Sequence, residues 1–203
     1  PISILRWSSD SQQLLFQSII THEKAINTYT INSINRDGSH QTQLSQEFGV
    51  DMGISLSPDE STLYLAELRA DSGYDISSMD IDGSNRRLLE DFEACFMCKG
   101  HQWTPDGLSI VFYMHSDLYI IDADGKNLRQ LTDFAEDYDM TDAVNSPFGR
   151  PTYTISSDGQ SLVYTMGYPM IQLVKMPLGV DGWVQRQVVY ESTSNRFRGA
   201  LLS

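Results

Sequence analysis

Short apolar segments alternate with polar turns along the whole chain, and four of these segments follow the same kind of turn. The turns read SSDS, SPDE, TPDG and SSDG, and they begin at Ser8, Ser57, Thr104 and Ser156. Four to six residues after each turn aspartate stands an apolar triplet: Leu14–Phe16, Leu63–Leu65, Ile110–Phe112 and Leu162–Tyr164. Aliphatic, β-branched and aromatic residues in runs of this length favour a strand buried between neighbours. We therefore predict a strand directly after each of these turns.

Each predicted strand is followed by another strand and then by a second turn. It is Asp-Gly in every case, at Asp37-Gly38, Asp82-Gly83, Asp124-Gly125 and Asp181-Gly182. Asp-Gly between two extended segments is a strong hairpin signal, because glycine tolerates the positive φ that the turn needs. Six residues after each glycine comes an aliphatic residue: Leu44, Leu89, Leu131 and Val188. The pattern therefore predicts a further strand on either side of each Asp-Gly.

The two turns together define a repeat of four antiparallel strands. Its first strand ends in an apolar residue just ahead of the first turn: Trp7, Leu56, Trp103 or Ile155. The turn aspartates Asp10, Asp59, Asp106 and Asp158 are 49, 47 and 52 residues apart. One four-stranded sheet cannot bury both of its faces, whereas sheets stacked around an axis can, as in a β-propeller. We predict an all-β propeller with almost no helix, in one domain over 1–203, with repeats over approximately 1–49, 50–97, 98–149 and 150–196.

This pattern resembles a known family of repeats. The third copy, WTPDGLSIVFYMHSDLYIIDADGKNLRQLT, is similar to the TolB-like, WD-repeat-like β-propeller repeat, and the second copy, LSPDESTLYLAEL…MDIDGSNRRLLED, is nearly as close. The first copy lacks the proline and the glycine of the first turn, and the fourth has MPLGVDG where DADG is expected. The resemblance implies the propeller fold. It also suggests several settings: a periplasmic protein-binding partner as in TolB, the propeller of a prolyl oligopeptidase-like or tricorn-like protease, or an oligogalacturonate lyase with an axial histidine-rich metal site.

The last residues resemble the first strand of another repeat. Ser203 falls where Ser8, Ser57, Thr104 and Ser156 fall, and Gly199 precedes it as Gly53 and Gly100 precede their turns. Residues 197–203 are thus expected to start a fifth copy. We expect these repeats to be part of a larger propeller, and a genuine four-repeat domain is the alternative.

Composition and charge narrow the range of partners. The formal net charge is −13, with 14 Lys and Arg against 27 Asp and Glu. Such an acidic surface repels phosphate backbones, so a nucleic-acid partner is not expected. No apolar run approaches the length of a membrane span. The sequence has no nucleophile elbow, phosphate-binding loop, dinucleotide fingerprint or zincin motif, so neither a catalytic constellation nor a cofactor is expected within it.

Variable connections indicate where a partner would bind. In a propeller, the connections between repeats and those between the second and third strands share one face, which we call the loop face. The two tight turns share the opposite turn face. The longest connection, 133–151, carries five acids with Phe134, Tyr138 and Phe148 among them. Variable loops on a rigid scaffold commonly carry binding sites. We assign as candidate binding residues Asp137, Tyr138, Asp139, Asp142, Arg150, His101, His115 and Arg198.

Each of these features has an alternative interpretation. The acidic connection is a binding loop for a basic or hydroxyl-rich partner, a calcium loop, or a solvated loop whose aromatic residues pack on the sheet; it lacks the ligand order of an EF-hand. Cys95 and Cys98 favour a structural pair, because one Cys-x-x-Cys is half a zinc site and no helix follows it. Scattered histidines do not predict a metal site. Asp10, Asp59, Asp106 and Asp158 are predicted to cap their own turns rather than to act as catalytic acids.

Two classes of function remain open. The first is a non-enzymatic scaffold that binds a protein or peptide, or alternatively a carbohydrate, through the loop face. The second is the propeller domain of a larger peptidase or polysaccharide lyase whose catalytic residues lie outside these residues. An extracytoplasmic sensor domain is a third alternative. A periplasmic or extracytoplasmic location is favoured by the resemblance alone.

Overall fold

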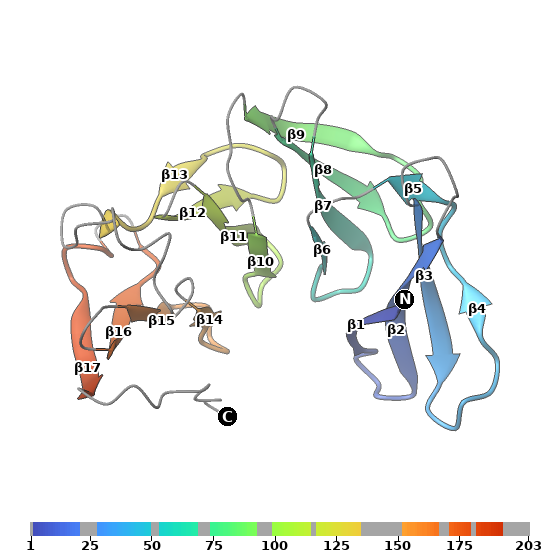
Figure 1. Cartoon of the computed structure of the whole chain (residues 1–203), viewed down its shortest axis with the longest axis horizontal. Coiled ribbons are helices and arrows are strands. Elements are labelled where there is room, and N and C mark those ends of the chain that lie inside the picture. Colours follow the sequence, from blue (N-terminus) through green and yellow to red (C-terminus); the bar gives the residue numbers. More distant parts are fainter. Residues whose placement is uncertain are drawn as a thin grey trace. The chain divides into compact units, whose positions relative to one another are not determined.

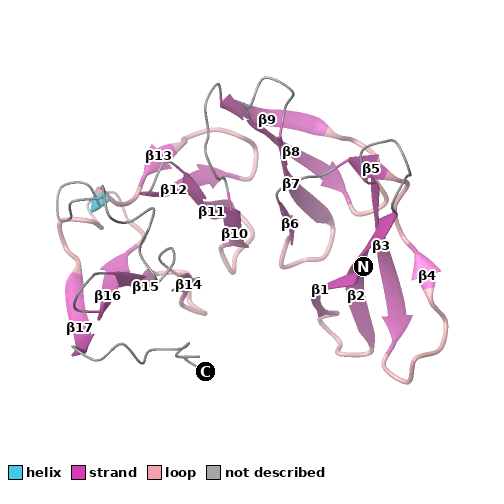
Figure 2. Ribbon diagram, viewed as in Figure 1, coloured by secondary structure: helices cyan, strands magenta, loops and turns pink. Residues whose placement is uncertain are grey.

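The computed structural model describes residues 2–20, 28–49, 53–68, 74–92, 99–114, 117–134, 152–166, 171–179 and 182–192. All the elements that it defines are β-strands, and they form four antiparallel sheets in chain order (Figures 1 and 2). Each sheet contains one of the four repeated patterns of turns and apolar triplets. The all-β class predicted from the sequence is therefore confirmed.

The first two sheets follow the chain strand by strand. The first has the order β1-β2-β3-β4, with β5 pairing β3: β1 (Ile2–Trp7), β2 (Gln13–Ile20), β3 (Thr28–Asn35), β4 (Thr42–Gln43) and β5 (Phe48–Gly49). The second has the order β6-β7-β8-β9: β6 (Gly53–Leu56), β7 (Thr62–Leu68), β8 (Tyr74–Asp80) and β9 (Arg87–Phe92).

The other two sheets repeat this order. The third is β10-β11-β12-β13: β10 (Lys99–Trp103), β11 (Ser109–Met114), β12 (Asp117–Asp122) and β13 (Arg129–Gln130). The fourth is β14-β15-β16-β17: β14 (Tyr153–Ile155), β15 (Ser161–Met166), β16 (Ile171–Pro177) and β17 (Gln187–Ser192). The chain divides into two compact units, Pro1–Arg129 and Gln130–Ser203, and each is described by itself.

Hydrogen bonds of the aspartate stabilise the first turn of each repeat. In the third repeat, the Asp106 carboxylate accepts the Leu108 N–H at 3.0 Å and the Thr104 hydroxyl at 2.6 Å. The Thr104 hydroxyl oxygen in turn accepts the Ser109 N–H at 3.0 Å. Asp10, Asp59 and Asp158 accept the corresponding bonds in the other repeats. The serine or threonine hydroxyl first, and the backbone N–H second, hold the pKa of each of these carboxyls below its ordinary value.

The last residue of this turn lies in the left-handed region of backbone space. Gly107 and Gly159 have φ of 71° and 69°, whereas Ser11 and Glu60 adopt 58° and 64° at the same place. A residue with a Cβ is strained there and glycine is not. The first two repeats therefore carry strained turns.

A Ser11→Gly variant is expected to raise the free energy of unfolding by about 0.5–1 kcal/mol, because it relieves this strain. Gly107→Ser is the matched reverse change in the third repeat and is expected to lower it by about 1 kcal/mol. Urea denaturation of both variants measures the effect. A Ser11→Gly variant that is less stable than the wild type would contradict the assignment of strain to this turn.

The Asp-Gly turns are three-residue hairpin loops in the first three repeats. In the second repeat, the Gly83 N–H donates to the Asp80 carbonyl and the Asp80 N–H donates to the Ser84 carbonyl, both at 2.9 Å. Gly38, Gly83 and Gly125 have φ of 84°, 86° and 88°, as this loop requires. The fourth repeat differs, since the Gly182 N–H donates instead to the Gly179 carbonyl. Its altered turn shifts the alignment: the strand register makes Val189, rather than the predicted Val188, the equivalent of Leu89.

Apolar contacts between neighbouring sheets form the core of the first unit. Tyr64, Ala66 and Ile76 of the second sheet share a cluster with Trp103, Ile110, Phe112, Met114 and Ile121 of the third. Leu15 and Ile31 of the first sheet share another with Leu56, Leu63, Leu65 and Met79 of the second. The second sheet thus buries one face against each neighbour, as a propeller blade does. The Trp103 indole N–H also donates to the Ser55 carbonyl of the second sheet at 3.3 Å.

The core of the second unit contains an aromatic cluster. The rings of Phe134 and Tyr164 have centroids 5.4 Å apart, and Phe134 meets Trp183 edge-on at 5.7 Å. The Arg186 guanidinium carbon lies 3.9 Å from the centre of the Trp183 ring, within cation–π range. The segment that follows the third sheet is therefore anchored on the fourth sheet through Phe134.

Candidate functional site

Most of the candidate loop-face residues lie outside the described residues. These are Asp137, Tyr138, Asp139, Asp142, Arg150, His115 and Arg198, together with the pair Cys95 and Cys98. The described part of the acidic connection is Asp133, which is exposed, and Phe134, which is 2% exposed and packed as described above. This one aromatic residue therefore packs on the sheet.

His101 lies in the interface between the second and third sheets. Its ring centroid is 5.0 Å from that of Tyr64 and 6.1 Å from that of Phe112. Its Nδ1 faces Gly53 so closely that a Cβ added there would lie 3.1 Å away. The neighbouring strands β6 and β10 thus approach each other where a glycine leaves room for the imidazole.

The environment of His101 keeps the ring neutral. Its Nε2 is buried and has no hydrogen-bond partner. Oε1 of the adjacent Gln102 is also buried without a partner. Burial lowers the pKa of His101 from 6.5 to about 4, because the charged imidazolium would lose its hydration there. The chemistry available is that of a neutral imidazole inside the protein. The equivalent positions in the other repeats hold Leu5, Ile54 and Tyr153. A comparison between repeats would therefore single out His101 as the one residue at this position with ring nitrogens.

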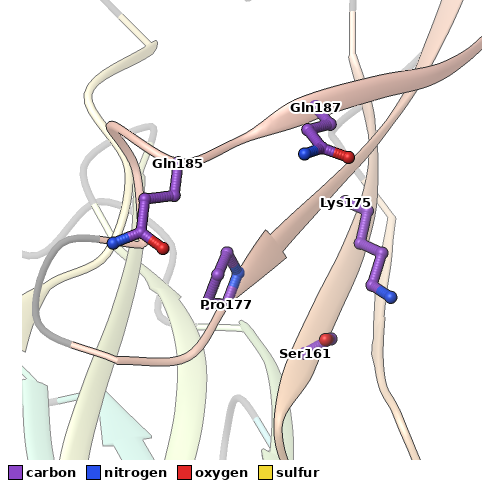
Figure 3. A pocket seen from close by; sticks show the side chains of 5 residues that line it. All are labelled: Ser161, Lys175, Pro177, Gln185 and Gln187. Atoms are coloured by element: carbon purple, nitrogen blue, oxygen red, sulfur yellow. The ribbon is translucent and has the colours of Figure 1, made fainter.

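A pocket lies on the fourth sheet and was not predicted from the sequence. It has a volume of about 520 Å³ and is lined by Ser161, Lys175, Pro177, Gln185 and Gln187 (Figure 3). Three strands and one turn build it: Ser161 begins β15 and pairs with Pro177 of β16, and Lys175 of β16 pairs with Gln187 of β17. Figure 3 shows the five side chains that line the pocket, and among them Lys175 is exposed.

The lining of this pocket suits oxygen acceptors. An ammonium group, two amides and a hydroxyl can donate to carboxylate or backbone carbonyl oxygens. A repeat comparison offered one signal for it: Lys175 stands where Ser33, Ser78 and Ile120 stand in the other sheets. A lysine at one copy of a position that is otherwise small or apolar marks the fourth repeat as different.

The described part of the chain contains no cluster of side chains that could form a metal site. There, no three His, Cys, Asp or Glu side chains gather in a way that could hold a metal ion. Within the same residues no helix has the length and apolar character needed to cross a membrane.

Similarity to known proteins is evident in structure and not in sequence. No protein-family model and no curated protein matches the chain. Among solved structures, TolB from Acinetobacter baumannii is 14% identical with a TM-score of 0.61, and the alignment covers 93% of this chain and 43% of that one. The β-propeller domain of the trilobed protease from Pyrococcus furiosus is 9% identical with a TM-score of 0.57, covering 93% and 57%.

A third similar structure is oligogalacturonate lyase from Vibrio parahaemolyticus, 12% identical with a TM-score of 0.57, covering 93% of this chain and 64% of that one. The chain therefore spans less than two thirds of each of these three structures. Likeness at this level of identity establishes the fold alone. The predicted TolB-like β-propeller fold is confirmed.

Proposed function

We propose that this propeller is a non-enzymatic scaffold that binds a protein or peptide through its loop face, in a periplasmic or other extracytoplasmic setting. The observation that carries the proposal is a difference between the two faces: the aspartates of the turn face are occupied in structural hydrogen bonds, whereas the variable connection carries further acidic residues. The turn-face aspartates of all four repeats are engaged in bonds within their own turns. The order of strands in the repeat assigns the long acidic connection to the opposite, loop face.

The structural likeness to TolB supports a binding role, and the acidic connection indicates the chemistry of the partner. Its five carboxylates within ten residues favour a basic peptide or a basic protein surface. Asp137, Tyr138, Asp139, Asp142 and Arg150 are the residues we propose for contact, with His115 and Arg198 on neighbouring loops. His101 is not among the residues we propose for contact, because its ring packs between two sheets.

A second candidate function is the propeller domain of a larger enzyme. The likeness to the propeller of the trilobed protease and to oligogalacturonate lyase favours it. In that case the scaffold would present substrate to catalytic residues outside this chain. A carbohydrate partner belongs to this alternative.

Peptides selected from a random display library against the wild-type chain are expected to be basic. An Asp137→Asn/Asp139→Asn double variant is expected to bind them at least about tenfold more weakly in calorimetry, since it removes two carboxylates from the proposed contact. Selection of neutral or acidic peptides would instead count against a basic partner.

The matched control is Gln12→Lys/Gln160→Lys. Both glutamines are exposed on the turn face, and the double change alters the net charge by the same amount as the loop-face variant. Equal weakening by both double variants would show that overall charge, rather than the acidic connection, governs binding, and the proposed face would be wrong.

A further inference from the structure

Both ends of the acidic connection are fixed on the same strand of the fourth sheet. At its start, the ring of Phe134 packs on that of Tyr164, with centroids 5.4 Å apart. At its end, Tyr153 pairs with Tyr164 in the sheet, and the Thr165 N–H donates to the Thr152 carbonyl at 2.9 Å. The connection therefore leaves from and returns to two adjacent residues of β15, as in a surface loop whose ends are held close together.

The start of the connection also contacts the Asp-Gly turn of the fourth repeat. The Trp183 ring meets Phe134 edge-on, with centroids 5.7 Å apart, and stacks on Tyr164 at 6.3 Å. Trp183 directly follows the Asp-Gly pair of its repeat. The other repeats have a polar residue at this place: Ser39, Ser84 and Lys126. The two departures from the regular repeat, the longest connection and the altered turn, thus meet at one aromatic contact.

Trp183 is held in place by its own segment. A Cβ added to Gly182 would overlap the Pro177 carbonyl oxygen, so the turn lies directly on the end of β16. The Arg186 guanidinium donates to the Trp183 carbonyl at 2.8 Å, and its carbon lies 3.9 Å from the centre of the Trp183 ring. A cation over the face of an indole is attracted to it. The turn therefore offers Phe134 a ring that is already fixed.

This anchor lies within the run of acidic residues. Asp133 is exposed and directly precedes Phe134. The remaining acids of the connection follow shortly after it: Glu136, Asp137, Asp139 and Asp142. Ordering a chain segment on binding costs conformational entropy, and a segment that is fixed beforehand costs less. A fixed start for the connection therefore favours binding through the carboxylates beside it.

We propose that Phe134 and Trp183 are positioning residues for a basic partner, because their contact holds the start of the acidic connection on β15. This role rests on the proposed function, in which the connection binds the partner. Neither ring needs to touch the partner itself. A residue in a tight turn of the turn face, Trp183, thereby governs the affinity of a connection that the strand order assigns to the loop face.

Calorimetry with the basic peptides selected against the wild-type chain tests this role. Phe134→Ala is expected to raise Kd about tenfold at a stoichiometry near one, since the folded variant must order the start of the connection on binding. Phe134→Leu retains an apolar anchor and is expected to stay within about threefold of the wild type. Ile155→Ala is the matched control, because it removes a buried side chain from the same sheet outside the ring contacts; its Kd is expected to change less than about twofold.

A double-variant comparison tests whether the two rings act together. Trp183→Leu is expected to raise Kd by about as much as Phe134→Ala, because each change removes the same contact. The double variant is then expected to bind within about twofold of either single variant. Two independent effects would instead multiply to about a hundredfold, and that result would overturn the joint role.

Fluorine spectra of a chain labelled with fluorotryptophan report the contact without any partner. The chain has three tryptophans, Trp7, Trp103 and Trp183, and replacing each in turn by phenylalanine assigns its signal. Phe134→Ala is expected to shift the Trp183 signal and to leave the other two in place. An unchanged Trp183 signal would show that the anchor is absent in solution and would overturn the proposal.

The binding data separate this role from the proposed function. Wild-type binding of basic peptides with an unchanged Kd in Phe134→Ala would overturn the positioning role alone. A lower stoichiometry at an unchanged Kd would do the same, since Phe134 would then serve only the fold. Equal rises in Kd for Phe134→Ala and the Ile155→Ala control would also count against it. A wild-type chain that selects no basic peptide would overturn the proposed function, and the positioning role with it.

Discussion

Lowering the pH from 7 to 4 is expected to weaken the wild-type fold by about 3 kcal/mol more than the fold of a His101→Leu variant. The pKa of His101 is about 4 in the folded chain and near 6.5 when the chain is unfolded. Between these values the unfolded chain binds a proton that the folded chain does not, so stability falls as the pH falls. The contribution is complete above pH 6.5 and is lost progressively down to pH 4.

Urea midpoints of both proteins at pH 7, 6, 5 and 4 measure this difference. The turn carboxylates have lowered pKa values in both proteins and weaken both folds equally below about pH 4, so they cancel in the comparison. At pH 7 the variant is expected to be at least as stable as the wild type, because it removes a buried nitrogen without a hydrogen bond. Parallel pH profiles for the two proteins would show that His101 is hydrated in solution.

Trp103→Ala is expected to lower the free energy of unfolding by about 3–5 kcal/mol, whereas Trp7→Ala should lower it by less than about 1 kcal/mol. The two residues end the first strand of their repeats and differ in their surroundings. Trp103 is 8% exposed within the cluster between the second and third sheets, and Trp7 is 49% exposed. Removal of the side chain would leave a cavity at Trp103 but not at Trp7.

Chemical denaturation measures both variants. Trp103→Phe is a useful intermediate, since it retains most of the apolar contact and loses only the bond to the Ser55 carbonyl, at a cost of about 1 kcal/mol. Similar losses for Trp7→Ala and Trp103→Ala would mean that the first repeat is covered in the single chain as fully as the third.

The four strands of each repeat could be read from the sequence because each depends on a local signal. The Asp-Gly turns of the first three repeats need glycine for their φ, and the serine or threonine two residues before each first-turn aspartate forms its bond within the turn. Among the pairings that the structure describes, the alignment was wrong in the last strand of the fourth repeat, where the equivalent of Leu89 is Val189 rather than Val188. There the regular Asp-Gly loop is replaced by a longer turn, so counting from the glycine no longer gives the register.

The contacts between sheets depend on residues far apart in the sequence, and no local pattern reports them. His101 has an imidazole where Leu5, Ile54 and Tyr153 have no ring nitrogen, and it is burial beside Tyr64, Phe112 and Gly53 that keeps this ring neutral. Lys175 reads as an ordinary exposed lysine until the strand pairing places it beside Gln187 in a pocket.

The sequence by itself determined the repeat, its turns and the all-β class, because short-range sterics and hydrogen bonds within ten residues specify a hairpin. Only the tertiary structure decided which turns are covered and which are open, since that depends on whether a neighbouring sheet lies against them. Gly38 and Gly125 have nearly the same φ, yet one faces open space and the other the backbone of Leu89. Burial is a property of the neighbour as much as of the residue, and the neighbour is about 40 residues away in the chain.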